Sequence, residues 1–164
     1  MARQDNDTTG LCAEIDSCKY LYLREIGEPQ DNELRLLVEE ADASETMRSM
    51  SLPGDVVLTG SEIRSDDKSR LFELSWSFYI AYSVRNESYV IADETEAIQS
   101  GHLLRLYAKS RFLDYISRST FASKDHPGGP LPPVEVVCLN HVIDVISIKL
   151  RQIRQLRPPR WSIQ

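Results

Sequence analysis

The stretch FELSWSFYIAYSV, residues 72–84, decides the fold, because its alternation of residue types is typical of a β-strand. All seven even positions carry an apolar or aromatic side chain, and the odd positions carry mostly small or polar ones. Thirteen extended residues would span about 43 Å, roughly twice the usual strand length. Such a strand must curve, carry a bulge or pass from one sheet to another.

The aromatic face of this strand is expected to lie in the core, since exposing so many large side chains would favour aggregation. The alternative is that the ends of the strand project beyond the sheet and receive a partner or a small apolar ligand.

The segments on both sides of this stretch carry similar patterns, separated by short turns. Residues 19–26 and 33–41 flank a turn rich in Gly, Pro, Asp and Asn, which predicts a hairpin. Residues 42–54 are polar and weakly patterned, which predicts a loop. Further strands are predicted at 55–64, 89–93, 102–110, 134–139 and 141–148. We expect 72–84 and 89–93 to pair as a second hairpin.

One segment changes to the helical period. In residues 111–122, Phe112, Tyr115, Ile116 and Phe121 recur at helical intervals, and Ser110 can cap the N-terminus. Residues 123–133 contain four prolines and two glycines, which predicts an exposed irregular loop. Residues 141–156 fit both a strand and one helical face; we predict a strand through Ile148 and leave a helix over 149–157 as an open alternative.

The fold class predicted from these elements is α+β and β-dominated. It consists of a mainly antiparallel curved sheet or half-barrel of seven or eight strands with one covering helix, whose Phe112 and Tyr115 meet the aromatic row. The chain divides into a loosely ordered N-terminus (1–17), a single globular domain (18–148) and a basic C-terminal tail (149–164).

Composition and charge exclude several classes of protein. The chain has 164 residues, 41% of them hydrophobic, as expected of one globular domain. Its net charge of −6 argues against nucleic acid and anionic membrane as partners. The last sixteen residues nevertheless carry five bases and no acid. This tail could bind a phosphate or an acidic partner, or could simply be solvated.

Cysteine usage and hydropathy indicate the compartment. No apolar run approaches the ~20 residues that a membrane helix needs, and no secretory signal precedes the first strand. The three cysteines are odd in number and irregularly spaced, which argues against a disulfide framework. A reducing cytoplasm is therefore the expected location.

Motifs that carry catalysis are missing from the sequence. Cys138 and His141 form the one close Cys/His pair, but side chains three positions apart on a strand point to opposite faces. The sequence contains no nucleophile elbow, no phosphate-binding glycine loop and no cysteine spacing of a zinc site. We predict no catalytic residue, no metal and no cofactor.

Two stretches have the composition of a recognition site. The first, residues 82–89, gathers tyrosines, an arginine and polar side chains where two strands are expected to join. Its candidate binding residues are Tyr82, Arg85, Asn86, Glu87 and Tyr89. The second is the proline-rich loop around Asp125 and His126. The alternatives are a polar hairpin turn with an Arg–Glu contact and an irregular connector.

The leading functional hypothesis is a small acidic protein-binding or regulatory module without catalysis of its own. Small antitoxin and immunity proteins have this composition, and the comparison rests on composition alone. The alternative is a small-molecule carrier or enzyme whose pocket is lined by Trp76, Phe78 and Tyr82, with Arg105 or Tyr107 orienting the ligand. A third hypothesis is a homo-oligomer whose long hairpin supplies the interface.

Overall fold

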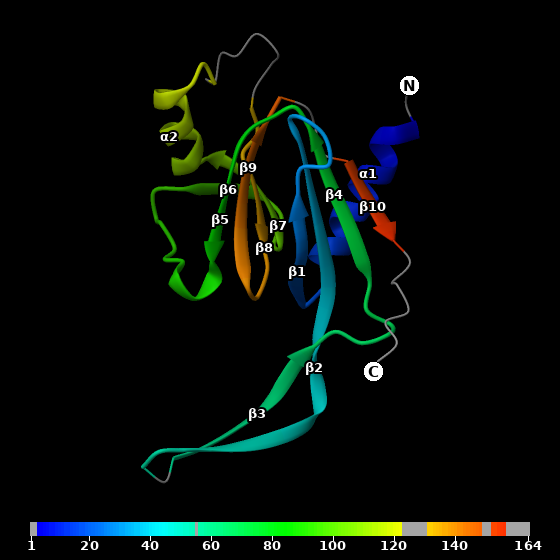
Figure 1. The fold of residues 1–164 in the computed structure, drawn as a ribbon, viewed down its shortest axis with the longest axis vertical. Helices are drawn as coiled ribbons and strands as arrows, with labels where there is room; N and C mark the ends of the chain where they lie inside the picture. The colour runs from blue at the N-terminus through cyan, green and yellow to red at the C-terminus, as the bar shows by residue number, and fades with distance from the viewer. Residues whose placement is uncertain (1–2, 55, 123–130, 149–151, 157–164) are drawn as a thin grey trace.

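The computed structural model describes residues 3–54, 56–122, 131–148 and 152–156, and in these ranges the chain is β-dominated (Figure 1). The strands form two antiparallel sheets of five strands, in the orders β1-β2-β4-β10, with β3 paired to β2, and β5-β9-β8-β7-β6. The elements are α1 (Arg3–Asp16), β1 (Tyr20–Gly27), β2 (Glu33–Leu52), β3 (Val56–Arg64), β4 (Leu71–Ser77), β5 (Tyr79–Asn86), the 3-10 helix η1 (Glu87–Tyr89), β6 (Ala97–Ser100), β7 (Leu104–Lys109), α2 (Arg111–Ser119), β8 (Val134–Val137), β9 (His141–Ser147) and β10 (Gln152–Leu156). The predicted fold class is confirmed, with ten described strands in place of seven or eight.

Residues 72–84 pass from the first sheet to the second. The stretch breaks at Phe78, which has a φ of 60°, and so divides into β4 of the first sheet and β5 of the second. Only its first half keeps the predicted burial: Phe72 and Trp76 are buried, whereas Phe78 is 53% exposed. A left-handed residue turns the chain and shifts the alternation, so the even positions of β5 no longer form one core face.

The expected pairing of this stretch with residues 89–93 is wrong. β5 pairs with β9, and Glu87–Tyr89 form a 3-10 helix in place of a hairpin turn. The turn-like composition after Asn86 ends β5 locally, but the partner strand comes from about 60 residues further along the chain. The expected hairpin of β1 and β2 is present.

The N-terminal segment expected to be loosely ordered contains α1. Ile15 and Cys18 are fully or almost fully buried, and the Asp16 carboxylate accepts the backbone N–H groups of His102, Leu103 and Leu104 at 2.8–3.0 Å. The C-terminal end of α1 is thus held by contacts with the start of β7, which no local pattern could indicate.

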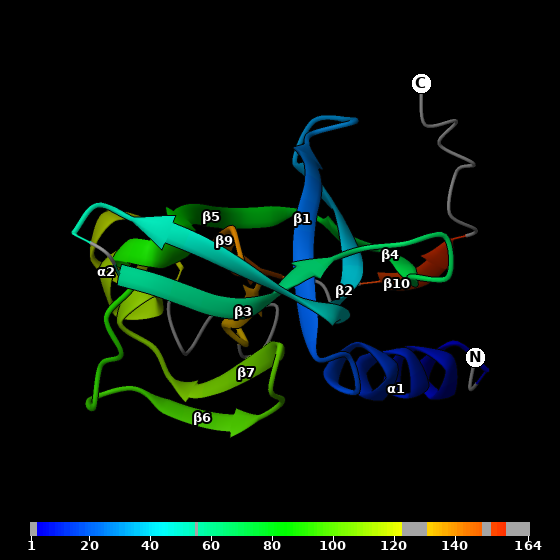
Figure 2. The same cartoon turned by 90° about the horizontal axis from the view of Figure 1, so that it is seen from below.

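Residues 42–52, expected to be a loop, continue β2 as a strand paired with β3. We call residues 43–52 together with β3 the arm. Figure 1 shows the arm extending away from both sheets, and Figure 2 shows it from below, with α1 and α2 on opposite sides of the body. Side chains are exposed from Glu45 to Leu52 and along β3, apart from a half-buried Ile63. Because both faces meet water, the sequence lacks the burial pattern that marks a strand.

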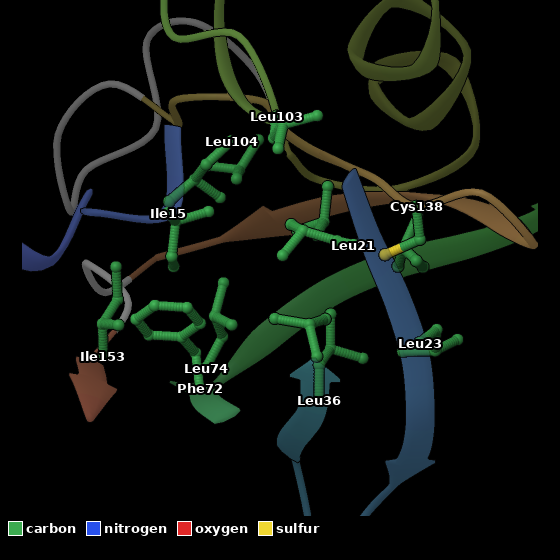
Figure 3. Packing of buried hydrophobic residues seen from close by; sticks show 14 of the residues in the cluster. Ile15, Leu21, Leu23, Leu36, Phe72, Leu74, Leu103, Leu104, Cys138 and Ile153 are labelled. Atoms are coloured by element: carbon green, nitrogen blue, oxygen red, sulfur yellow. The ribbon is translucent and has the colours of Figure 1, made fainter. Parts of the chain in front are cut away.

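The main core lies between the two sheets. Its residues come from β1, β2, β4 and β10 on one side and from β7, β8 and β9 on the other. Figure 3 shows part of this packing, with Phe72 and Leu74 of β4 near Ile15 of α1 and Leu104 of β7.

A smaller cluster lies under α2, where Leu113 and Ile116 pack with Ile146 of β9. Ser110 caps α2 as predicted, by accepting the Leu113 N–H. Phe112 packs against this cluster, as do Ile80 and Ala81 of β5, but Tyr115 is 65% exposed.

The segment 149–157, for which a helix was considered, contributes β10 in its described part, residues 152–156. β10 pairs antiparallel with β4, and Ile153 enters the main core. No helix in the described ranges is both long enough and apolar enough to cross a membrane.

Candidate functional site

The register of the second sheet aligns four polar side chains across its outer face, the face turned away from the main core. Ser83 of β5 lies opposite Asp144 of β9, Asp144 lies opposite Glu135 of β8, and Glu135 lies opposite Arg105 of β7. Their strand neighbours Val136, Ile143 and Val145 point inward and are buried in the core. Alternation along each strand therefore places one polar row on the outer face.

Glu135 is the centre of this row, and it is only 4% exposed. One carboxylate oxygen accepts Arg105 Nη1 at 3.0 Å and the Tyr107 hydroxyl at 2.9 Å. The other oxygen accepts Arg85 Nη2 at 2.9 Å. Arg85 also contacts Asp144 at 2.9 Å, and Ser83 donates to Asp144 at 2.8 Å. We call Arg85, Arg105, Tyr107, Glu135 and Asp144 the outer-face network.

Two neighbouring carboxylates on one face repel each other, so the arginines are needed for this arrangement. Burial raises the pKa of Asp144, while the hydrogen bond from Ser83 and the charge of Arg85 oppose that rise. Burial, followed by the hydrogen bond to Glu135, raises the pKa of Tyr107 to about 12. Tyr107 is therefore a neutral donor at physiological pH. A buried ionic network of this kind often stabilises a fold no more than apolar residues of similar volume would. A role in binding is therefore a second explanation for its presence.

A hollow of about 120 Å³ lies next to this network. On one side it is lined by residues of the sheet: Arg85, Arg105, Tyr107 and Glu135. On the other side it is lined by residues of the segment 90–98: Val90, Ile91, Ala92, Asp93, Glu96 and Ile98. The hollow thus combines charged and apolar walls, as small-ligand sites do.

The structure separates the residues predicted for the first recognition site. Arg85 belongs to the outer-face network, but Tyr82 packs edge-on against Tyr79 and donates to Glu28 at 3.0 Å. Asn86 accepts the Ser88 N–H and so caps η1, which contains Glu87, and Tyr89 is 83% exposed. These five residues do not form one cluster.

The remaining predicted site residues lie elsewhere. Asp125 and His126 fall outside the described residues. Trp76 is 1% exposed and lies in the main core, so its ring is not accessible to a ligand. Arg105 and Tyr107, which were expected to orient a ligand inside the curved sheet, instead line the hollow on the outer face.

Sequence reasoning missed Glu135 and Asp144, which hold the network together. Each is a single carboxylate within an otherwise apolar strand, VEVV for Glu135 and HVIDVIS for Asp144. Acidic residues are rarely buried unless they are paired. A single acidic residue within a buried strand was therefore the available signal for Glu135 and Asp144. Which residues they pair with depends on the register of the sheet.

The two buried cysteines do not suit nucleophilic chemistry. Burial raises the pKa of the Cys138 thiol to about 12. Burial, followed by the nearby charge of Glu40, raises the pKa of Cys18 to about 11. Both thiols are protonated at neutral pH and are poor nucleophiles. Among the described residues, no group of three or more His, Cys, Asp or Glu side chains is placed to hold a metal ion.

The arm offers a second surface, whose two faces differ in chemistry. Directly paired residues share a face, so the pairs Met50–Leu58 and Leu52–Val56 form one apolar patch. We call these four residues the tip-face patch; they are 38–65% exposed. The opposite face carries Met47 and Val57 among four hydroxyl side chains: Ser49, Ser51, Thr59 and Ser61.

Comparisons of the chain with protein-family models, curated proteins and solved structures found no match.

Proposed function

We propose that the chain is a protein-binding module and that the arm is its contact surface. The observation that carries this proposal concerns the two hydrophobic clusters. Among the described residues, neither cluster includes a residue of the arm. The arm therefore contributes no side chain to either cluster of the described residues, and it exposes apolar side chains to water.

Energetic considerations support a covered arm. A two-stranded ribbon alone is at best marginally stable in water, and a third element packed on its face stabilises it. The tip-face patch joins four large apolar side chains through two cross-strand pairs. Covering them would contribute on the order of 1 kcal/mol or more per side chain.

From this patch toward the root of the arm, the ion pair of Arg48 with Glu62 comes first, and the charged side chains of the root follow. A hollow of about 530 Å³ lies there, and six of its ten lining residues are charged. They are Glu40, Asp42, Glu45, Arg64, Asp66 and Lys68. An apolar centre with a charged, solvated border is typical of protein interfaces.

The test compares the two faces of the arm. A photo-crosslinking amino acid is placed at position 58 or at position 57 of the full chain, in cells that produce the protein. We expect position 58 to capture a defined partner and position 57 to capture less of it. The partner is then purified and titrated against variants.

The variants form a matched pair. M50T/L58T removes two side chains of the tip face, which are 65% and 55% exposed; M47T/V57T removes two of the opposite face, which are 65% and 60% exposed. The first should raise the Kd at least tenfold, and the second should leave it almost unchanged. Equal effects would contradict the proposal. Capture of a second copy of the chain would identify the arm as a homo-oligomer interface.

A further inference from the structure

We infer that the hollow beside the outer-face network binds a small zwitterion, a molecule of the size of glycine or alanine that carries both a carboxylate and an ammonium group. This site lies on the second sheet and does not depend on the function proposed for the arm. The inference rests on the unused donors of two arginines, on the charge of the lining and on the volume of the hollow.

The arginines provide the carboxylate-binding groups. A guanidinium has five N–H donors, and its fork geometry suits a carboxylate. Arg85 uses Nη2 for Glu135 and Asp144, and in the described part of the chain its Nε and Nη1 make no contact. Arg105 uses Nε for the His102 carbonyl and Nη1 for Glu135, which leaves Nη2.

These remaining donors are accessible to a ligand. The side chains of Arg85 and Arg105 are 42% and 30% exposed, and both residues line the hollow. Glu135 already accepts three donors, from Arg85, Arg105 and Tyr107, so at most one acceptor site remains on it for the three donor nitrogens that are left. An incoming acceptor would complete the hydrogen bonding of the two guanidinium groups.

The charge of the lining argues against a simple anion. Three carboxylates line the hollow, from Glu135, Asp93 and Glu96, against two guanidinium groups, so the lining carries a net charge of −1. Glu96 accepts the Arg111 N–H with one oxygen at 2.9 Å, and its second oxygen makes no contact with the described residues. That oxygen can accept a hydrogen bond from an ammonium group. A molecule that carries both charges can therefore bind the arginines with its carboxylate and Glu96 with its ammonium group.

The hollow is small and open to solvent on one side, with a volume of about 120 Å³. It can enclose the carboxylate and ammonium groups of a small amino acid, while a longer side chain would extend into solvent. Val90, Ile91 and Ile98 offer apolar contact to a methyl group such as that of alanine.

The first experiment titrates the full-length chain by NMR with glycine, L-alanine, L-leucine, acetate and methylammonium. Glycine and alanine should shift resonances of Arg105, Ile91 and their neighbours. Acetate and methylammonium, each carrying one of the two charges, should bind at least about tenfold more weakly. L-Leucine, whose side chain can extend into solvent, serves as a third zwitterion. Equal binding of acetate and glycine would replace the inference with a simple anion site. No shift with any zwitterion would overturn it.

The second experiment uses a matched pair of variants in the same loop. Glu96→Gln keeps an oxygen for the Arg111 N–H but removes the charge that would meet the ammonium group. Glu94→Gln removes a charge from an exposed side chain outside the lining. We expect Glu96→Gln to weaken glycine binding about tenfold and Glu94→Gln to leave it unchanged. Equal binding by the two variants would overturn the inference, and an unchanged NMR spectrum away from the loop would show that both are folded.

Discussion

The two halves of β2 belong to one strand but lie in different environments. In the half within the body, β2 pairs with β1 on one side and β4 on the other, and Leu34, Leu36 and Val38 are completely buried. In the arm, β2 pairs with β3 alone, and Met50 is 65% exposed. Backbone pairing with β3 is therefore enough to form a strand in the arm, whereas burial of the strand requires elements packed on its face.

The first prediction tests whether the arm packs on the body, by replacing one leucine in each half of the comparison. Leu36→Ala removes a fully buried side chain and should lower the free energy of unfolding by about 3 kcal/mol, since it leaves a cavity. Leu58→Ala, in the arm, should change it by less than about 0.5 kcal/mol. Urea denaturation of the two variants measures both values. A comparable loss in Leu58→Ala would mean that the arm contributes to the core.

The same comparison explains which parts of the fold the sequence could predict. Residues 33–41 alternate because one face is buried, so that strand was predicted from its pattern alone. Residues 42–52 are held by backbone pairing with β3 and bury almost no side chain, so a strand there leaves no hydrophobic period. The helix α2 was predicted because its cap at Ser110 and its apolar face are local features.

Features that depend on distant segments could not be predicted. α1 is anchored through Asp16 to backbone groups 86 to 88 residues later. The candidate site has the same origin: Arg105, Glu135 and Asp144 come from three strands and meet only through sheet register. The sequence identified Arg85, Arg105 and Tyr107 as polar candidates, but their common partner Glu135 required the structure.

The second prediction concerns the joint between the two halves of β2. Glu40 lies at this joint, and both of its carboxylate oxygens accept the Arg70 guanidinium, at 2.7 and 2.8 Å. Glu40→Gln should therefore lower the free energy of unfolding by about 1.5 kcal/mol at pH 7. Asp42→Asn, two residues further along, is the control: its side chain is 74% exposed and its contact with Lys19 is 3.4 Å long, so little change is expected.

The pH dependence of this effect has a defined sign. The hydrogen bonds from the Arg70 side chain lower the pKa of Glu40. A carboxyl group whose folded-state pKa is depressed contributes stability above its unfolded pKa, about 4.3, and loses it as the pH falls through the folded value. The gap between wild type and Glu40→Gln should therefore shrink on acidification below about pH 4. A gap that stays constant down to pH 2 would show that the effect is not ionic.

The third prediction concerns Phe78, the residue at which the chain passes from the first sheet to the second. β2 continues into the arm as one strand, with an irregular register between Ala43 and Met47, whereas β4 ends at Ser77 and the next residue, Phe78, has a φ of 60°. Phe78→Ala and Phe78→Gly lose the same side chain, but only glycine adopts this conformation without steric cost. Phe78→Gly should be the more stable variant by about 1 kcal/mol in thermal or urea unfolding. At the neighbouring Ser77, which is not among the positive-φ residues, the order should reverse, because glycine within a strand is less stable than alanine. If alanine is preferred at both positions, the two strands are joined by an ordinary bend, and the break at Phe78 does not explain why the aromatic row is buried in β4 and partly exposed in β5.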